Sequence, residues 1–152
     1  MMKTVQQLVD KYYTSNDYNM LRDRTKQDYQ YFLRVMCQEF GDVKYDELTS
    51  KQAKHAYEEW VARGISLANH ICTVSSIVYR YAIDMEYATV NPFASVKRKT
   101  APQRKVVWTE DEVRQFLDTA YSQFQWRSLG LIVHMAYDWC QRLGDMRLLT
   151  WD

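Results

Sequence analysis

Hydrophobic residues recur every three or four positions along most of this 152-residue chain, the spacing of amphipathic α-helices. The clearest stretch begins near Ser66. Its apolar positions follow in steps of four, three, four and three: Leu67, Ile71, Val74, Val78 and Tyr81. Side chains at this spacing share one face of a helix, so the pattern predicts a helix with one buried face and one free polar face.

The same periodicity predicts helices from Thr4, from Arg22 to Phe40, from Thr49 to Gly64, from Thr109, and from Trp126 to Trp139, with a polar loop over Thr14–Asn19. Three of these starts carry a capping-box sequence, in which a threonine is followed three residues later by Gln or Glu: Thr4–Gln7, Thr49–Gln52 and Thr109–Glu112. Only four Gly and two Pro interrupt the chain. The pattern therefore predicts an all-α fold.

Both prolines and the densest basic cluster fall within 91–107, which indicates an extended linker. We therefore expect a helical domain over 1–90, a basic linker over 91–107, and the start of a second domain over 108–152.

The net charge of +1 is small for a nucleic-acid-binding protein, but the charge is segregated. Between Trp60 and Ile83 there is no acidic residue, and between Met85 and Trp108 Glu86 is the only one. The three cysteines are far apart and odd in number, and no secretory signal or membrane-spanning run is present, so we expect free thiols and a cytoplasmic protein. The scattered His and Cys residues predict no metal site.

The C-terminal run from Cys140 to Asp152 holds Arg142 just after an apolar segment, followed by Gly144-Asp145 and ending in Trp151-Asp152. This run resembles the first arginine motif of the tyrosine recombinases, the phage integrase family. Upstream landmarks follow in the family's order: Thr25 and Tyr29, Phe40-Gly41, Leu48-Thr49, Gly64-Ile65-Ser66 with Asn69, Tyr79 to Ile83, Asn91-Pro92-Phe93, and Trp108 to Glu112. The resemblance implies a small SAM-like helical core-binding domain, a linker, and the first helices of an α+β catalytic domain.

In that family the arginine contacts the scissile phosphate, which assigns this role to Arg142 and a supporting role to Asp145. A guanidinium suits the role because it donates two parallel hydrogen bonds to a phosphate. The commonest family pattern has Thr-Gly before the arginine region and often Glu at the position of Asp145, whereas this chain has Trp139-Cys140-Gln141.

The resemblance also implies a tyrosine nucleophile that forms a 3′-phosphotyrosyl intermediate, together with a lysine hairpin and a His-x-x-Arg motif, and all of these would lie beyond Arg142. We therefore expect the intact enzyme to cut and rejoin DNA and this chain alone to be inactive. Tyr29, Tyr57 and Tyr81 stand at helical core spacing and are interpreted as packing residues. No metal or nucleotide cofactor is expected.

Core-binding domains of this family clamp duplex DNA with two helices, which points to the polar faces of the second and fourth long helical segments and to the linker. The candidate DNA contacts are Lys26, Gln30 and Arg34; Asn69, His70, Thr73, Ser76 and Arg80; and Lys97, Arg98, Lys99, Arg104 and Lys105. Polar side chains can bond base edges, and basic ones neutralise phosphates. Each could also belong to an ordinary solvated helix face or an exposed basic tether.

Two other functions fit the same residues. The chain could be a DNA-binding regulator or decoy without catalysis, or a helical domain whose Trp and Tyr residues anchor a protein partner. For the recombinase we expect double-stranded DNA as partner, a homotetramer of the intact enzyme on DNA, a monomer for this chain alone, an accessory DNA-bending protein in some systems, and no membrane. Because the core-binding region begins almost at Met1, we also expect no arm-binding domain.

Overall fold

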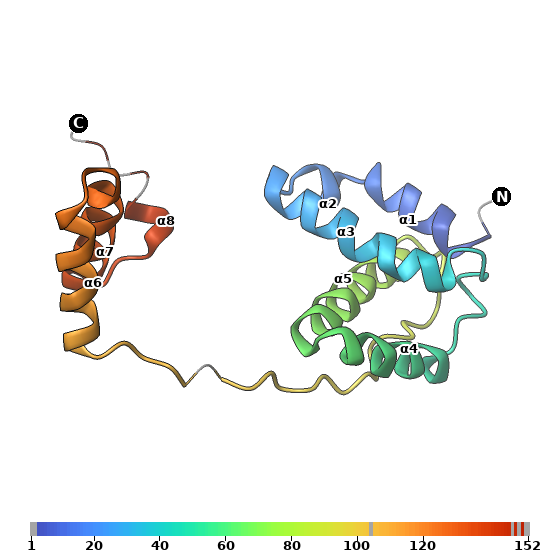
Figure 1. The fold of residues 1–152 in the computed structure, drawn as a ribbon. Helices are drawn as coiled ribbons and strands as arrows, with labels where there is room; N and C mark the ends of the chain where they lie inside the picture. Colours follow the sequence, from blue (N-terminus) through green and yellow to red (C-terminus); the bar gives the residue numbers. More distant parts are fainter. Residues whose placement is uncertain (1–2, 104, 147, 149, 151–152) are drawn as a thin grey trace. The chain divides into compact units, whose positions relative to one another are not determined.

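The computed structural model describes residues 3–103, 105–146, 148 and 150, and its contacts divide the chain into two compact units, Met1–Pro102 and Gln103–Asp152. Figure 1 shows helices in both units. Among the described residues, regular structure is helical apart from one isolated bridge between Thr4 and Lys44, so the all-α prediction is confirmed. None of the described helices is long and apolar enough to span a membrane.

The first unit begins with α1 (Val5–Tyr13), α2 (Asn16–Asn19) and α3 (Asp23–Phe40). The predicted capping box at Thr4 is present, and its hydroxyl accepts from the Gln7 amide at 3.3 Å. The expected loop over Thr14–Asn19 is wrong, because α2 forms there. Ser15 caps this short helix, and the buried Tyr18 ring packs edge-on against Tyr12 at 5.7 Å. One aromatic residue thus anchors an otherwise polar segment.

Helices α4 (Ser50–Arg63) and α5 (Ile65–Asp84) form a packed pair, and α5 also contacts α1 and α3. Gly64 joins the pair with a φ of 144°, a conformation open to glycine and strained for other residues. Along α5 the apolar stripe is buried as predicted, except that Leu67 is only partly buried. The largest core side chains include Trp60 and Tyr57 from α4.

The C-terminus of α5 closes with a Schellman motif. The Tyr87 amide donates to the Ala82 carbonyl at 2.7 Å, and the Glu86 amide donates to the Ile83 carbonyl at 2.9 Å. The Tyr87 ring packs edge-on against Tyr81. Glu86 occupies the left-handed position of this motif, with a φ of 59°, where glycine is the usual residue.

Residues 91–99 pack on the first unit, so the expectation that an extended linker starts at Asn91 is wrong. Phe93 is 1% exposed and stacks on Trp60 at 6.4 Å, and Val96 is buried. The boundary between the units falls after Pro102. Burial of two apolar side chains within this stretch outweighs its loop-like composition.

The second unit contains α6 (Glu110–Ser122), the 3₁₀ turn η1 (Phe124–Trp126), α7 (Arg127–Trp139) and α8 (Leu143–Met146). The predicted capping box joins Thr109 and Glu112, and Trp108 packs edge-on against Phe116. A β-carbon at Gly130 would lie 3.0 Å from the Ala120 β-carbon, so this glycine permits close packing of α7 on α6. Large apolar side chains remain exposed on this unit: Trp108, Phe124, Trp126, Leu129, Leu131, Tyr137 and Trp139.

Candidate nucleic-acid interface

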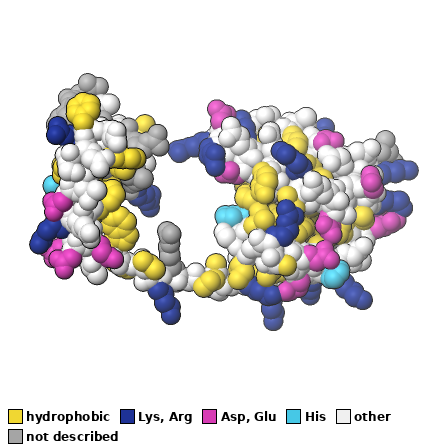
Figure 2. Space-filling model, viewed as in Figure 1, with side chains coloured by type: hydrophobic (Ala, Val, Ile, Leu, Met, Phe, Trp, Pro, Cys, Tyr) yellow, Lys and Arg dark blue, Asp and Glu magenta, His cyan; other side chains and the backbone are white. Residues whose placement is uncertain are grey.

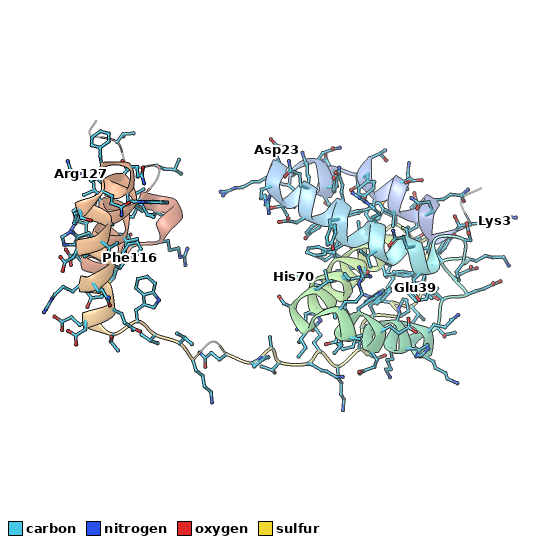
Figure 3. The ribbon with its side chains drawn as sticks, viewed as in Figure 1. Lys3, Asp23, Glu39, His70, Phe116 and Arg127 are labelled. Carbon is cyan, nitrogen blue, oxygen red and sulfur yellow. The ribbon has the colours of Figure 1, made fainter. Side chains whose placement is uncertain are left out.

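Helix α5 carries no acidic residue before Asp84, and its side chains include exposed His70 and Arg80. An anionic phosphate would therefore meet no repulsion from this helix over most of its length. Figure 3 labels His70 on α5. Both side chains are exposed, although the His70 ring is stacked on Phe32, and their contact with DNA stays a prediction.

The other three members of the predicted α5 stripe are engaged within the protein. Ser76 is 8% exposed, so the expectation that it lies on a free face is wrong. Its hydroxyl accepts a hydrogen bond from Asn91 Nδ2 at 2.9 Å. The Thr73 hydroxyl donates to the Asn69 carbonyl at 2.7 Å, one turn earlier in α5. Local periodicity alone could not reveal that these hydroxyls have internal partners.

Asn69 is half-buried and uses both ends of its amide. The Tyr57 hydroxyl donates to Asn69 Oδ1 at 2.7 Å, and Asn69 Nδ2 donates to the Lys99 carbonyl at 2.9 Å. Its role as a direct DNA contact stays a prediction, but the structure gives it a second role inside the unit.

Helix α3 packs against α5 through an aromatic pair: the rings of Phe32 and His70 are stacked at 5.3 Å and 12°. At about 100° per residue, Phe32, with the His70 ring stacked on it, lies on a different side of α3 from Lys26, Gln30 and Arg34. These three residues are all predicted contacts, and among them Gln30 and Arg34 are exposed while Lys26 is half-buried.

The α3 side chains differ in how firmly they are held. Gln30 Nε2 donates to the Tyr18 hydroxyl at 3.0 Å, and the Lys26 ammonium lies 6.0 Å from the centre of the same ring. Arg34 lines an open groove of about 450 Å³ that also includes Tyr13 and Cys37. Burial raises the pKa of Cys37 to about 11, so this thiol is protonated at neutral pH.

The basic cluster has two environments. Lys97, Arg98 and Lys99 belong to the first unit, where Lys99 pairs with Glu58. Arg98 lies next to Cys72, whose pKa is raised by burial and lowered in part by this guanidinium. Lys105 is exposed in a stretch without helix, and Arg104 lies outside the described residues.

Basic and acidic side chains alternate over the visible face of the first unit (Figure 2). On α3, for example, Arg24 pairs with Asp28 at 3.6 Å. Such exposed pairs contribute little stability, and they dilute the positive potential of the surface. The acid-free stretch of α5 and the 97–99 segment are therefore better suited to an anionic ligand than the unit as a whole.

The arginine motif begins where α7 ends. Cys140, the C-cap of α7, adopts a left-handed conformation with a φ of 52°, so the chain turns here without the glycine common in the resembled family. The Arg142 carbonyl accepts from the amides of Asp145 at 2.9 Å and Met146 at 3.1 Å, which starts α8. The side chains of Arg142 and Asp145 are exposed, and their catalytic roles stay predictions. Arg147 and Trp151–Asp152 lie outside the described residues.

Sequence reasoning missed one polar centre. Tyr57 was interpreted as a packing residue, and its ring is buried, but its hydroxyl bonds both Asn69 and Lys99. A buried tyrosine hydroxyl usually has a hydrogen-bond partner, so a tyrosine at a core position of the sequence already indicates a polar contact inside the protein. Within the described residues, no group of His, Cys, Asp and Glu is placed to hold a metal ion.

Comparison with solved structures places this fold among integrases. A lambda integrase dimer bound to a COC′ core site matches with a TM-score of 0.84 and 22% identity, over 97% of this chain and 42% of that one. A lambda integrase tetramer bound to a Holliday junction gives a TM-score of 0.85 at 22% identity, over 97% and 42%. The Tn1549 transposon integrase in complex with circular intermediate DNA gives 0.70 at 20%, over 88% and 45%.

The predicted resemblance to integrases is thus confirmed in the fold. The chain spans less than half the length of these integrase chains. No protein-family model and no curated protein sequence matches it.

Proposed function

We propose that the chain is the DNA-binding part of a tyrosine recombinase, which grips duplex DNA at a core recombination site. The observation that carries this proposal is the match of nearly the whole chain to an integrase bound to its core site. The acid-free stretch of α5, with exposed His70 and Arg80, supplies a surface of suitable chemistry.

In the intact protein, Arg142 would stabilise charge on the scissile phosphate and Asp145 would support it. A tyrosine beyond the present chain would attack the phosphodiester, form a 3′-phosphotyrosyl link and release a 5′-hydroxyl, without metal or nucleotide cofactor. Four protomers would act together on DNA in the bacterial cytoplasm, integrating a viral genome, with an accessory DNA-bending protein in some systems. The 152-residue chain alone would bind DNA as a monomer without cleaving it.

The test measures anisotropy of a fluorescent duplex of about 30 base pairs as the chain is added, at salt concentrations from about 50 to 200 mM. Binding should weaken as salt rises, because each neutralised phosphate releases counterions. Arg80→Ala should lower the slope of log affinity against log salt by about 1. The matched control is Arg63→Ala, which removes an exposed arginine from the last turn of α4 and should leave the slope unchanged.

Salt-independent binding, or equal effects of the two arginine substitutions, would contradict the proposed surface. Denaturing gels of the same mixtures should show no covalent protein–DNA adduct. In a longer protein that contains the nucleophile, Arg142→Lys should abolish adduct formation while duplex binding persists, since lysine cannot make the bidentate contact. Binding without adducts even in a protein extended beyond Asp152 would favour a DNA-binding regulator.

A further inference from the structure

The segment 96–99, which we call the strap, crosses the α4–α5 pair as part of the first unit. It holds three basic residues, and its Val96 side chain is buried. Upstream, Asn91 fixes the approach to the strap through its bonds to Ser76, and Phe93 lies against Trp60.

Lys99, the last residue of the strap, is held by three polar contacts. The Lys99 amide donates to the Tyr57 hydroxyl at 2.6 Å, its carbonyl accepts from Asn69 Nδ2 at 2.9 Å, and its ammonium pairs with Glu58. The Tyr57 hydroxyl in turn donates to Asn69 Oδ1 at 2.7 Å. Tyr57, Asn69 and Lys99 therefore form a closed hydrogen-bonded ring of three residues from α4, α5 and the strap.

We propose that Tyr57 and Asn69 are positioning residues that lock Lys99, so that Lys97, Arg98 and Lys99 act as a fixed part of the first unit's DNA-binding surface. This inference rests on the proposed function. A phosphate contact made by a fixed cation costs less conformational entropy than one made by a free tether. The basic residues of 91–107 thus divide into a fixed group that ends at Lys99 and a group beyond it, which includes Lys105 and lies outside the lock.

Limited trypsin digestion of the full chain tests the lock without DNA. Trypsin must engage the Lys99 side chain and attack its carbonyl, and the structure shows both groups occupied. Cleavage after Lys99 should therefore be slower than cleavage after Lys105. Tyr57→Phe keeps the buried ring and removes the hydroxyl, so the ratio of cleavage after Lys99 to cleavage after Lys105 should rise on the order of tenfold.

Tyr79→Phe is the matched control, because it removes another buried tyrosine hydroxyl, which donates to the Tyr45 carbonyl at 3.2 Å, and leaves the strap untouched. It should not change the ratio. Asn69→Ala, at a half-buried site, provides a second variant if Tyr57→Phe unfolds. The lock is refuted if wild-type cleavage is equally fast at Lys99 and Lys105, or if both lock variants fold and keep the wild-type ratio.

Duplex binding completes the test. Tyr57→Phe should raise Kd about threefold to tenfold with an unchanged salt slope, because the basic residues remain but must be ordered on binding. Lys97→Ala should instead lower the slope by about 1. If the wild-type chain shows no salt-dependent binding, the proposed function fails while the digestion result stands. If binding is normal in every lock variant, the positioning role fails alone.

Discussion

Replacing Glu86 by glycine should stabilise the first unit. Glu86 holds the left-handed position of the Schellman motif that ends α5, with a φ of 59°. For a residue with a β-carbon this conformation costs about 1–2 kcal/mol of free energy, whereas for glycine the cost is close to zero. Glycine also loses more conformational entropy on folding, which costs about 0.5–1 kcal/mol of stability. The difference between the midpoints of these ranges is a net stabilisation of about 0.75 kcal/mol.

Glu86→Ala separates the backbone effect from the charge effect. Both substitutions remove a carboxylate from the C-terminus of a helix, where the macrodipole disfavours negative charge. Alanine keeps the β-carbon and its strain, so the stability difference between the Gly and Ala variants isolates the left-handed conformation.

Thermal unfolding of the full chain, followed by calorimetry, measures the effect. For a unit of this size, 1 kcal/mol corresponds to a shift in Tm of about 4–8 °C. Hydrogen exchange at the Tyr87 amide, which donates to the Ala82 carbonyl, should slow in the Gly variant and thereby assign the change to this motif. A Gly variant no more stable than the Ala variant would refute the reasoning.

Two further predictions follow from other parts of the chain. With a thiol reagent at neutral pH, exposed Cys140 should react fast and Cys37 and Cys72 slowly, because burial raises the pKa of both; equal rates in the folded chain would contradict this. Hydrogen bonds from Thr109 lower the pKa of Glu112, so the capping box should stabilise α6 above the ordinary carboxyl pKa and lose this contribution as pH falls through the lowered value. Unfolding of Glu112→Gln across acidic pH should therefore show a shallower pH dependence than wild type, and parallel curves would contradict the assignment.

Local sequence patterns predicted the helices because the relevant interactions span only a few residues. The capping boxes at Thr4, Thr49 and Thr109 each join residues three apart, and all three are present. The helix α2, which was not predicted, depends on the burial of Tyr18 against the tyrosine rings of α1. These rings lie outside Thr14–Asn19, so the local sequence of that segment does not indicate the contact.

The candidate interface was less predictable because its polar side chains form hydrogen bonds with residues that are far away in the sequence. Ser76 is paired with Asn91, and Asn69 with Lys99, thirty residues away. A polar stripe at helical spacing looks the same whether water or a distant segment covers it. His70 and Arg80 are exposed, and their contact with DNA stays a prediction. The boundary of the first unit lies later in the chain than expected because Phe93 packs against Trp60.

The uncovered apolar side chains of the second unit bear on the colloidal behaviour of the chain. Trp126, Leu131, Tyr137 and Trp139 are about half exposed, and the chain carries a net charge of only +1 with a pI near 7.7. Charge repulsion between molecules is therefore weak near neutral pH. Association through exposed apolar side chains is opposed least under these conditions. Light scattering should show the strongest self-association close to the pI, and solubility should recover as pH moves away from it in either direction.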